Sequence, residues 1–407
     1  MKRSISGAVL LVLTALGGAA AQPARFEDVV RNLRNPDARV RMQAVRLLRE
    51  AQYPEAIIPL APLVNDPVEA IQLEAIAAEL SFFLVQDVPE RRRIGFVVEV
   101  RGRGGAEGAF EAGPLALWPK AAPPELVSEL LKAVDDEDAR VRREAIHAVG
   151  LVARPPLPPE AAQQVIRALD HYDPAVRAAA AKVAGRLEVT AAADVLLKAI
   201  NDSDARTRYA AMLALGALAD ERAVSALTAQ LEYYDKGEGA WSALDGLARI
   251  AHPSSIPQFT ARLADRDPNI RRAAAEGLAR TADASSKGVL ETGANTDPSA
   301  MVRAAMTFAL QRLGGHYIPR LAEFLNDGKV ARQVQEYLIE LGPPIERELL
   351  PILQEPDPAI RAAVADVLGA IGAEASLAAL KAVQDSDRGV VEAASRAVTR
   401  LQLRGMP

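Results

Sequence analysis

The sequence predicts an all-α protein, a right-handed α-solenoid of about eleven helix pairs with a small β-hairpin-like insertion. Residues 173–187 read DPAVRAAAAKVAGRL and residues 357–371 read DPAIRAAVADVLGAI, so nearly the same phrase occurs twice. From residue 173 onward, similar phrases begin about every 30 residues, a period typical of solenoids. Half of the residues are hydrophobic but only 4% are aromatic. Such an alanine-rich composition favours thin layers of closely stacked helices.

An aspartate heads each phrase and predicts the start of a helix. Aspartate at the N-cap accepts a hydrogen bond from the first free backbone amides, and a following proline begins the helix without losing a needed donor. The predicted head aspartates are Asp37, Asp66, Asp138, Asp173, Asp204, Asp235, Asp267, Asp297, Asp327, Asp357 and Asp387.

A branched residue and an arginine follow the head at fixed spacing. The branched residue, for example Val141, begins an apolar stripe that continues through Ala145 and Val149. The arginine can reach an aspartate in its own repeat or in the neighbouring one. The arginines of this kind are Arg41, Arg142, Arg177, Arg208, Arg271 and Arg361. Because the charged pair recurs from repeat to repeat, we interpret it as a structural ladder and not as a row of ligands.

Nine residues after the branched position a glycine often occurs, at Gly150, Gly185, Gly216 and Gly369. Glycine inside a helix costs about 1 kcal/mol relative to alanine, so its recurrence predicts that the next helix approaches too closely for a side chain. A second helix is expected between successive heads, for example over 192–200 and 374–383. Two stacked helices per repeat make an α-solenoid.

The phrase resembles HEAT repeats of the short type found in phycobilin-lyase-like and deoxyhypusine-hydroxylase-like proteins, whose shared pattern is D-P-x-V-R-x-x-A-x-x-A-L-G. The resemblance covers nearly all of the chain after residue 21 except about 85–122. It implies the fold but says little about function, since such repeats serve lyases, hydroxylases and scaffolds alike.

The N-terminus has the layout of a secretory signal peptide. Lys2 and Arg3 precede an apolar run, and small residues follow up to a predicted cleavage site before Gln22. The run is too short for a bilayer span of about 20 residues, so we expect an exported protein, periplasmic or secreted, with no integral membrane segment after cleavage. The expected domains are a signal peptide over 1–21, N-terminal repeats over 22–84, an insertion over 85–122 and a repeat array over 123–407.

The charge balance argues against two classes of partner. Without Lys2 and Arg3 the chain has 46 basic and 53 acidic residues, a net charge of −7. Nucleic acid or an anionic membrane is therefore not expected as the main partner. The chain has no cysteine, so it cannot be held by disulfides in an oxidising compartment.

The insertion is the first place where the repeat breaks down. Alternating apolar residues over 94–100 beside a glycine-rich turn at 102–108 predict a β-hairpin or strand-like arm. Arginine and tryptophan often anchor interfaces, so the arm is a candidate docking element; alternatively it folds back and covers the solenoid. Its candidate partner-binding residues are Arg91, Arg92, Arg93, Arg101, Arg103 and Trp118.

The repeat headed by Asp235 is the second departure. Gly239 takes the place of the branched residue, and Trp241 stands at an outward position that is occupied by Tyr209 in the preceding repeat. With Tyr233 and Tyr234 in the adjacent loop, these aromatic side chains could form an exposed binding patch. Alternatively, Trp241 fills the space left by Gly239.

Known catalytic patterns do not match this sequence. Hydroxylases of the repeat class bind two irons through His-Glu pairs, but none of the histidines here, His147, His171, His252 and His316, precedes a glutamate. A lone histidine such as His147, expected at an outward position, is more often a surface residue than a ligand. No catalytic, cofactor-binding or metal-binding residues are therefore predicted. We expect a non-catalytic scaffold for a protein or peptide partner; the alternative is a bilin lyase-like or metal-dependent enzyme of the same repeat class.

Overall fold

The structure is a computed structural model that describes residues 25–85, 89–94, 98–103 and 105–405, without the side chains of residues 86–104. The predicted signal peptide and its cleavage site lie outside these ranges, so they remain predictions. The described chain divides into two compact units, one formed by residues up to 117 with 121–168, and one formed by 118–120 with 169 onward. Their boundary falls inside the segment 123–407, which the sequence analysis treats as one array.

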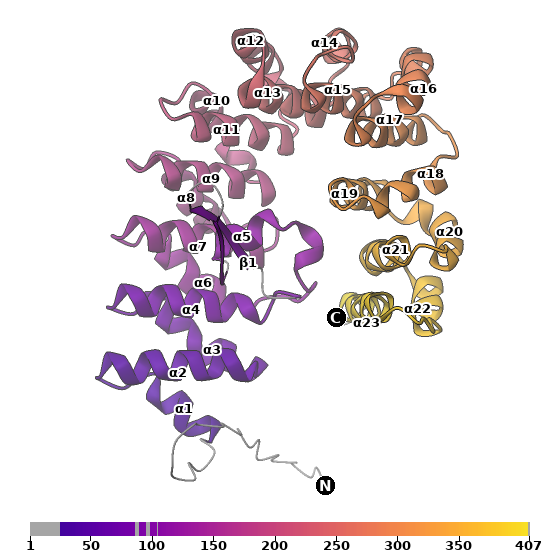
Figure 1. Ribbon diagram of the computed structural model, residues 1–407. Coiled ribbons are helices and arrows are strands. Elements are labelled where there is room, and N and C mark those ends of the chain that lie inside the picture. The colour runs from indigo at the N-terminus through magenta and orange to yellow at the C-terminus, as the bar shows by residue number, and fades with distance from the viewer. Residues whose placement is uncertain (1–24, 86–88, 95–97, 104, 406–407) are drawn as a thin grey trace. The chain divides into compact units, whose positions relative to one another are not determined.

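Unit 1 contains eight α-helices and the two strands of the insertion (Figure 1). Its elements are α1 (Phe26–Asn32), α2 (Ala38–Ala51), α3 (Ile57–Leu60), α4 (Glu69–Ser81), β1 (Pro89–Ile94), β2 (Val98–Arg103), α5 (Ala106–Glu111), α6 (Pro124–Ala133), α7 (Ala139–Val152) and α8 (Pro159–Ala168).

Unit 2 contains the remaining helices. They are α9 (Pro174–Arg186), α10 (Ala193–Ala199), α11 (Ala205–Ala217), α12 (Val224–Tyr234), α13 (Gly237–Ile250), α14 (Ile256–Arg262), α15 (Pro268–Arg280), α16 (Lys287–Thr296), α17 (Ala300–Arg312), α18 (Ile318–Glu323), α19 (Ala331–Leu341), α20 (Glu346–Leu349), α21 (Pro358–Ile371), α22 (Glu374–Lys381) and α23 (Arg388–Arg404).

Short 3-10 helices directly precede or follow the shorter helix of most helix pairs. They are η1 (Pro54–Ala56), η2 (Ala61–Asn65), η3 (Pro114–Ala116), η4 (Thr190–Ala192), η5 (Glu221–Ala223), η6 (Pro253–Ser255), η7 (Ala284–Ser286), η8 (Phe324–Asn326), η9 (Pro343–Ile345) and η10 (Leu350–Gln354). With α5 set aside, the other 22 α-helices in the described ranges follow one another as 11 pairs, which confirms the predicted repeat number. Within unit 2, successive long helices pack side by side: α9 on α11, α11 on α13, α13 on α15, and α15 on α17.

Most predicted head aspartates are N-caps. Their side chains accept hydrogen bonds from backbone amides at the starts of the long helices, with N···O distances of 2.7 Å at Asp173 and 2.8 Å at Asp267. The confirmed caps are Asp37, Asp138, Asp173, Asp204, Asp267, Asp357 and Asp387.

Four of the predicted heads are not caps, so the prediction was wrong for them. Asp66 and Asp297 lie two residues before the caps Val68 and Ser299, and their carboxylates accept from the amides of those residues. Asp235 ends α12 with a positive φ of 55°. Asp327 precedes α19 by several residues, and that helix is capped by Val330. The repeat thus has two acidic positions, a cap position and a pre-cap position two residues earlier. The sequence pattern did not distinguish between them.

The recurring glycines mark close helix contacts, as predicted. A Cβ atom at Gly216 would lie 2.7 Å from the Cα of Gly246 on the next long helix, and one at Gly369 would lie 2.7 Å from the Cα of Ala397. A Cβ at Gly185 would lie 2.9 Å from the backbone of Ala214. Helix backbones therefore meet at these positions with no room for a side chain.

The insertion contains a two-stranded antiparallel sheet. Its register pairs Pro89 with Arg103 and Ile94 with Val98. The chain therefore reverses direction between Ile94 and Val98. The prediction that the chain turns at the glycine-rich stretch 102–108 was wrong, because that stretch ends β2 and leads into α5.

Candidate functional site

An arginine–aspartate clamp joins neighbouring repeats. Arg271 donates from Nε and Nη2 to the two carboxylate oxygens of Asp297, at 2.8 and 2.9 Å, and from Nη1 to the carbonyl oxygens of Asp265 and Arg266. The two side chains are only 11% and 8% exposed. The equivalent clamps are Arg41 with Asp66, Arg177 with Asp202, and Arg361 with Asp385.

The clamp shifts the acidity of its aspartate. Burial alone would raise the pKa of Asp297, but the hydrogen bonds from Arg271 and from the amide of Ser299 outweigh it, so the pKa falls below its usual value. The carboxylate is therefore charged and paired at neutral pH. These contacts support the structural interpretation of the ladder.

The clamp differs at several other junctions; in α19, for example, Val334 takes the arginine position. Gln72 takes the arginine position in α4 and donates to Asp136 at 2.7 Å. Arg208 donates from Nε to the hydroxyl of Tyr234 at 2.6 Å. In α13 the arginine position is occupied by Ala240. The last two changes coincide with the repeat that the sequence analysis singled out.

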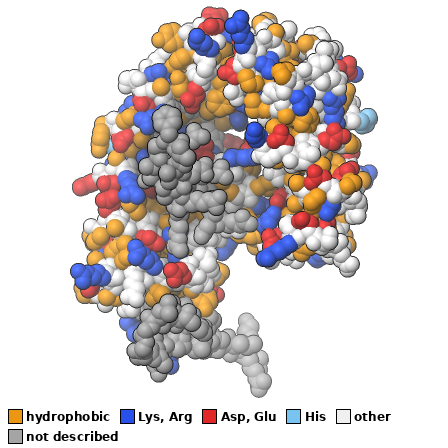
Figure 2. All heavy atoms as spheres, in the orientation of Figure 1, with side chains coloured by type: hydrophobic (Ala, Val, Ile, Leu, Met, Phe, Trp, Pro, Cys, Tyr) orange, Lys and Arg blue, Asp and Glu red, His pale blue; other side chains and the backbone are white. Residues whose placement is uncertain are grey.

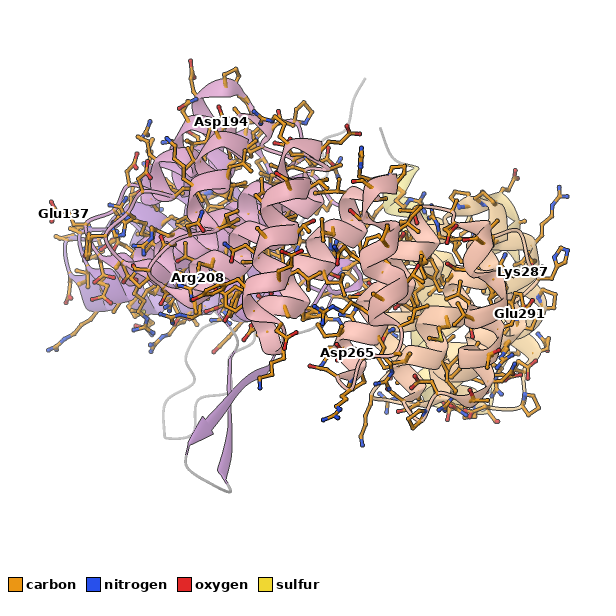
Figure 3. All side chains as sticks on the ribbon, turned by 90° about the horizontal axis from the view of Figure 1, so that it is seen from above. Glu137, Asp194, Arg208, Asp265, Lys287 and Glu291 are labelled. Carbon is orange, nitrogen blue, oxygen red and sulfur yellow. The ribbon has the colours of Figure 1, made fainter. Side chains whose placement is uncertain are left out.

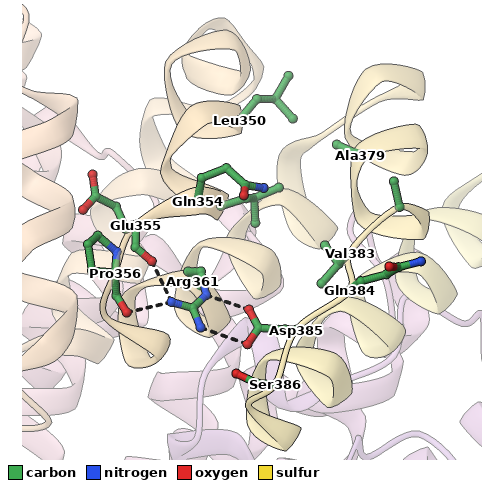
Figure 4. Close-up of a pocket in the computed structure, with 12 residues that line it drawn as sticks. Leu350, Gln354, Glu355, Pro356, Arg361, Ala379, Val383, Gln384, Asp385 and Ser386 are labelled. Carbon is green, nitrogen blue, oxygen red and sulfur yellow. Dashed lines mark hydrogen bonds and ion pairs between the residues drawn. The ribbon is translucent and has the colours of Figure 1, made fainter.

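A shallow groove of about 620 Å³ lies beside the last complete clamp (Figure 4). Leu350 and Leu353 line it from one repeat and Ala379 and Val383 from the next, and the Arg361–Asp385 clamp lies among its lining residues. The same kind of clamp occurs in other repeats, so the clamp gives this groove no chemistry of its own.

The predicted tyrosine cluster is present. The ring of Tyr234 contacts those of Tyr209 and Tyr233 edge to face, at centroid distances of 5.8 and 5.0 Å. Tyr233 is 80% exposed. A Cβ atom at Gly239 would collide with the ring of Tyr234, so Tyr234, and not Trp241, occupies the space left by this glycine.

Trp241 lies apart from this space, on the side of α13 that faces α15. The guanidinium carbon of Arg272 lies 5.5 Å from the centre of its ring. The indole Nε1 is buried and has no hydrogen-bond acceptor among the described residues. Trp241 is therefore part of a different set of contacts, described below.

The predicted partner-binding residues of the insertion belong to both units of the structure. The backbones of Arg91, Arg92 and Arg93 belong to β1 and those of Arg101 and Arg103 to β2, but their side chains lie outside what the structure describes. Trp118 belongs to unit 2, where its ring lies 5.8 Å from the guanidinium carbon of Arg400.

The α5 part of the insertion covers α7. The carboxylate of Glu144 accepts a hydrogen bond from the amide of Ala106 at the start of α5, and the ring of Phe110 lies 5.4 Å from that of His147. His147 is fully buried, so its predicted outward position was wrong. The sequence could not show this, because the covering helix comes from outside the repeat.

Glu79 is a buried carboxyl group at a core position of α4. The equivalent residues in other repeats are apolar, and in several of them they are fully buried leucines such as Leu48 and Leu215. Glu79 is 1% exposed, and neither carboxyl oxygen has a hydrogen-bond partner among the described residues. Burial raises its pKa well above the ordinary value.

Replacing Glu79 with leucine is expected to stabilise the protein by about 1–3 kcal/mol, the cost of burying an unpaired polar group. The native carboxyl group holds its proton more tightly when folded. Its contribution to the free energy of unfolding is therefore complete below the pKa of the unfolded state and is lost as the pH rises through the pKa of the folded state. Urea unfolding between pH 4 and 8 should show this decline in the native protein and less of it in Glu79→Gln. A leucine variant less stable than the native protein would contradict the interpretation.

An ionic network crosses the faces of four long helices in unit 2. At its centre, Glu276 accepts from Arg272 at 2.7 Å and from the hydroxyl of Tyr337, and lies 3.5 Å from Arg280. Arg280 also pairs with Glu340 at 2.9 Å. The members of the network are Trp241, Asp245, Arg249, Arg272, Glu276, Arg280, Arg312, Gln333, Tyr337 and Glu340.

The network has a buried floor and a more open rim. Asp245 and Glu276 are each 2% exposed, whereas Arg249, Arg312 and Glu340 reach solvent. Burial would raise the pKa of Asp245, but the nearby charges of Arg249, Arg272 and Arg280 lower it overall. Four arginines face three carboxylates, so the network carries one net positive charge.

The network was not predicted from sequence. On two of the long helices its residues lie four positions apart: Trp241, Asp245 and Arg249 on α13, and Arg272, Glu276 and Arg280 on α15. The corresponding residues of α11 are Tyr209, Leu213 and Ala217. The signal in the sequence is the replacement of apolar by charged residues at this one helix face, and it matches no catalytic motif.

Three further observations concern metal binding, membrane insertion and surface charge. In the described ranges no group of three or more His, Asp or Glu side chains is arranged to hold a metal ion. No helix in those ranges combines the length and apolarity needed to cross a bilayer. On the face shown in Figure 2, basic and acidic side chains are intermixed, without one large patch of either sign.

A family profile of HEAT repeats matches residues 162–239, 235–311 and 318–399, more than half of the chain. The chain belongs to the HEAT-repeat family. The resemblance stated from the sequence is thereby confirmed, and so is the all-α solenoid. No curated protein matches this HEAT-repeat chain.

Solved structures similar to this HEAT-repeat protein include an engineered protein, with a TM-score of 0.43, 18% identity and coverage of 93% of this chain and 98% of that one. The complex of CpcE and CpcF of phycocyanin lyase from Nostoc sp. has a TM-score of 0.40 and 19% identity, covering 61% and 97%. Human deoxyhypusine hydroxylase in complex with glycerol has a TM-score of 0.27 and 19% identity, covering 71% and 96%. At such low identities and TM-scores, these likenesses say nothing about function.

Proposed function

We propose that this HEAT-repeat chain is a non-catalytic scaffold that binds a polypeptide partner along the long helices of unit 2. The observation that carries the proposal is the ionic network, where polar and aromatic side chains replace the small and apolar residues of other repeats. The adjoining Tyr209–Tyr234 cluster supports it, because exposed aromatic residues and arginines dominate the energetics of interfaces.

The proposed location is outside the cytoplasm, supported by the basic, apolar and small-residue segments of the first 21 residues. Cell fractionation followed by N-terminal sequencing would test it. A mature protein beginning at Gln22 in the periplasm or medium is the expected result, and an uncleaved protein in the cytoplasm would contradict it.

The alternative is an enzyme of the same repeat class. Metal analysis and absorbance spectroscopy of the protein purified from its native cells separate the two proposals. A scaffold should contain no stoichiometric iron and no bound pigment. Either finding would reject the non-catalytic proposal.

Crosslinking in native cells, followed by mass spectrometry, tests the scaffold itself. Lys236 and Lys329 precede α13 and α19, whereas Lys287 projects outward from the short helix α16 (Figure 3). We expect crosslinks to a partner polypeptide at Lys236 and Lys329 and few at Lys287. Crosslinks concentrated at Lys287, or none to any polypeptide, would contradict the proposed surface.

A further inference from the structure

The ionic network retains hydrogen-bond donors that the protein itself does not use. Within the part of the chain that the structure describes, Nε1 of Trp241 is buried without an acceptor, and Nη1 of Arg280 is buried without a hydrogen bond, although it lies 3.5 Å from a carboxylate oxygen of Glu276. A buried donor without a partner costs about 1–3 kcal/mol. Such groups are rare in native structures, and an unseen ligand is one physical explanation.

Both unused groups belong to one set of contacts. Arg272 lies over the ring of Trp241 and pairs with Glu276, which is also the neighbour of Arg280. Each guanidinium offers five N–H donors. Among the described residues Arg272 uses one of them in a hydrogen bond, to Glu276, so other donors of this guanidinium are available to a ligand.

The charge of the network points to the same kind of ligand. Its four arginines exceed its three carboxylates, in a chain whose net charge is −5. Arg249 and Arg312 stand at the more open rim. Positive charge with free N–H groups complements an anionic acceptor, and in a polypeptide that acceptor is a carboxylate.

We propose that the face around Trp241, Arg272 and Arg280 binds an acidic segment of a polypeptide partner, with a glutamate or aspartate carboxylate accepting from the indole and the guanidinium. The inference rests on the proposed scaffold function and names the chemistry of its partner. It also explains why a tryptophan occupies this position, since phenylalanine would fill similar space without offering a donor.

The test uses the full chain and three fluorescein-labelled peptides of eight glutamates, eight glutamines or eight lysines. Fluorescence anisotropy should show binding of octaglutamate that weakens with added salt, and no comparable binding of octaglutamine or octalysine. Equal binding of octaglutamine, or no binding of octaglutamate, would overturn the inference. If a partner were nevertheless crosslinked to Lys236, the proposed scaffold function would stand and only the proposed acidic ligand would be rejected.

Variants separate binding from folding. Trp241→Phe removes a buried donor that has no partner among the described residues, so we expect a melting temperature that is not lowered and binding of octaglutamate weakened about tenfold. Arg280→Gln should weaken it at least as much. Arg206→Gln, at an exposed arginine of α11, is the matched control and should bind as the native protein does. Native affinity in Trp241→Phe and Arg280→Gln would reject the proposed contacts.

Discussion

Replacing Arg271 with alanine is expected to lower the free energy of unfolding by about 3–5 kcal/mol, the cost of breaking a buried ion pair from one side. The variant leaves Asp297 nearly buried without its bidentate partner and frees the carbonyl groups of Asp265 and Arg266. Urea unfolding followed by circular dichroism measures the loss. Hydrogen exchange should place it in α15 and α17, because a clamp joins only adjacent repeats.

The matched control is Arg388→Ala. Arg388 is 92% exposed and pairs with Glu392 on its own helix, so its removal should change stability by less than about 0.5 kcal/mol. The pH response gives a second check. The pKa of Asp297 is depressed in the folded state. Its contribution to the free energy of unfolding is therefore present above the unfolded pKa and is lost as the pH falls through the folded pKa. Arg271→Ala should lack part of this acid-dependent loss, and equal stability of the two arginine variants would contradict the clamp.

Replacing Gly216 with leucine is expected to destabilise unit 2 by about 3 kcal/mol, at the upper end for an overpacked core. The first atom of the new side chain would lie 2.7 Å from the Cα of Gly246, so two helix backbones must separate. Thermal unfolding measures the effect. Gly288→Leu on α16 is the control, because a Cβ there meets nothing within 4 Å; it should gain up to about 1 kcal/mol of helix propensity. A Gly216→Leu variant as stable as Gly288→Leu would show that the long helices are not in tight contact.

The repeat could be predicted because its rules are local. Within fifteen residues the sequence specifies a helix cap at Asp173, a first turn at Pro174, a core position at Val176 and a close helix contact at Gly185. The structure contains all four features. The pattern could not distinguish the cap position, occupied for example by Asp267, from the pre-cap position two residues earlier in the repeat, occupied for example by Asp297. Both accept from a backbone amide two residues further on, but only Asp297 also pairs with an arginine of the preceding repeat, Arg271.

The candidate site was only partly predictable. Tyr209, Tyr233 and Tyr234 were found because aromatic residues stand out in a chain that has few of them. Glu276 did not stand out, since a glutamate on a helix is ordinarily a solvated residue; its burial comes from Tyr337 and Arg280, and Tyr337 lies 61 residues further along the chain. Contacts between distant repeats of this kind leave no local trace in the sequence.

Because position 240 is alanine, the long helix α13 has no arginine clamp of its own. Between α13 and α15 the contact at the turn edge comes instead from Arg262 at the end of α14, which lies 3.6 Å from a carboxylate oxygen of Asp235, while Trp241 and Arg272 join the helix faces. A ligand that contacts both Trp241 and Arg280 would add a further link between α13 and α15. Hydrogen exchange in these two helices should therefore slow when such a ligand binds.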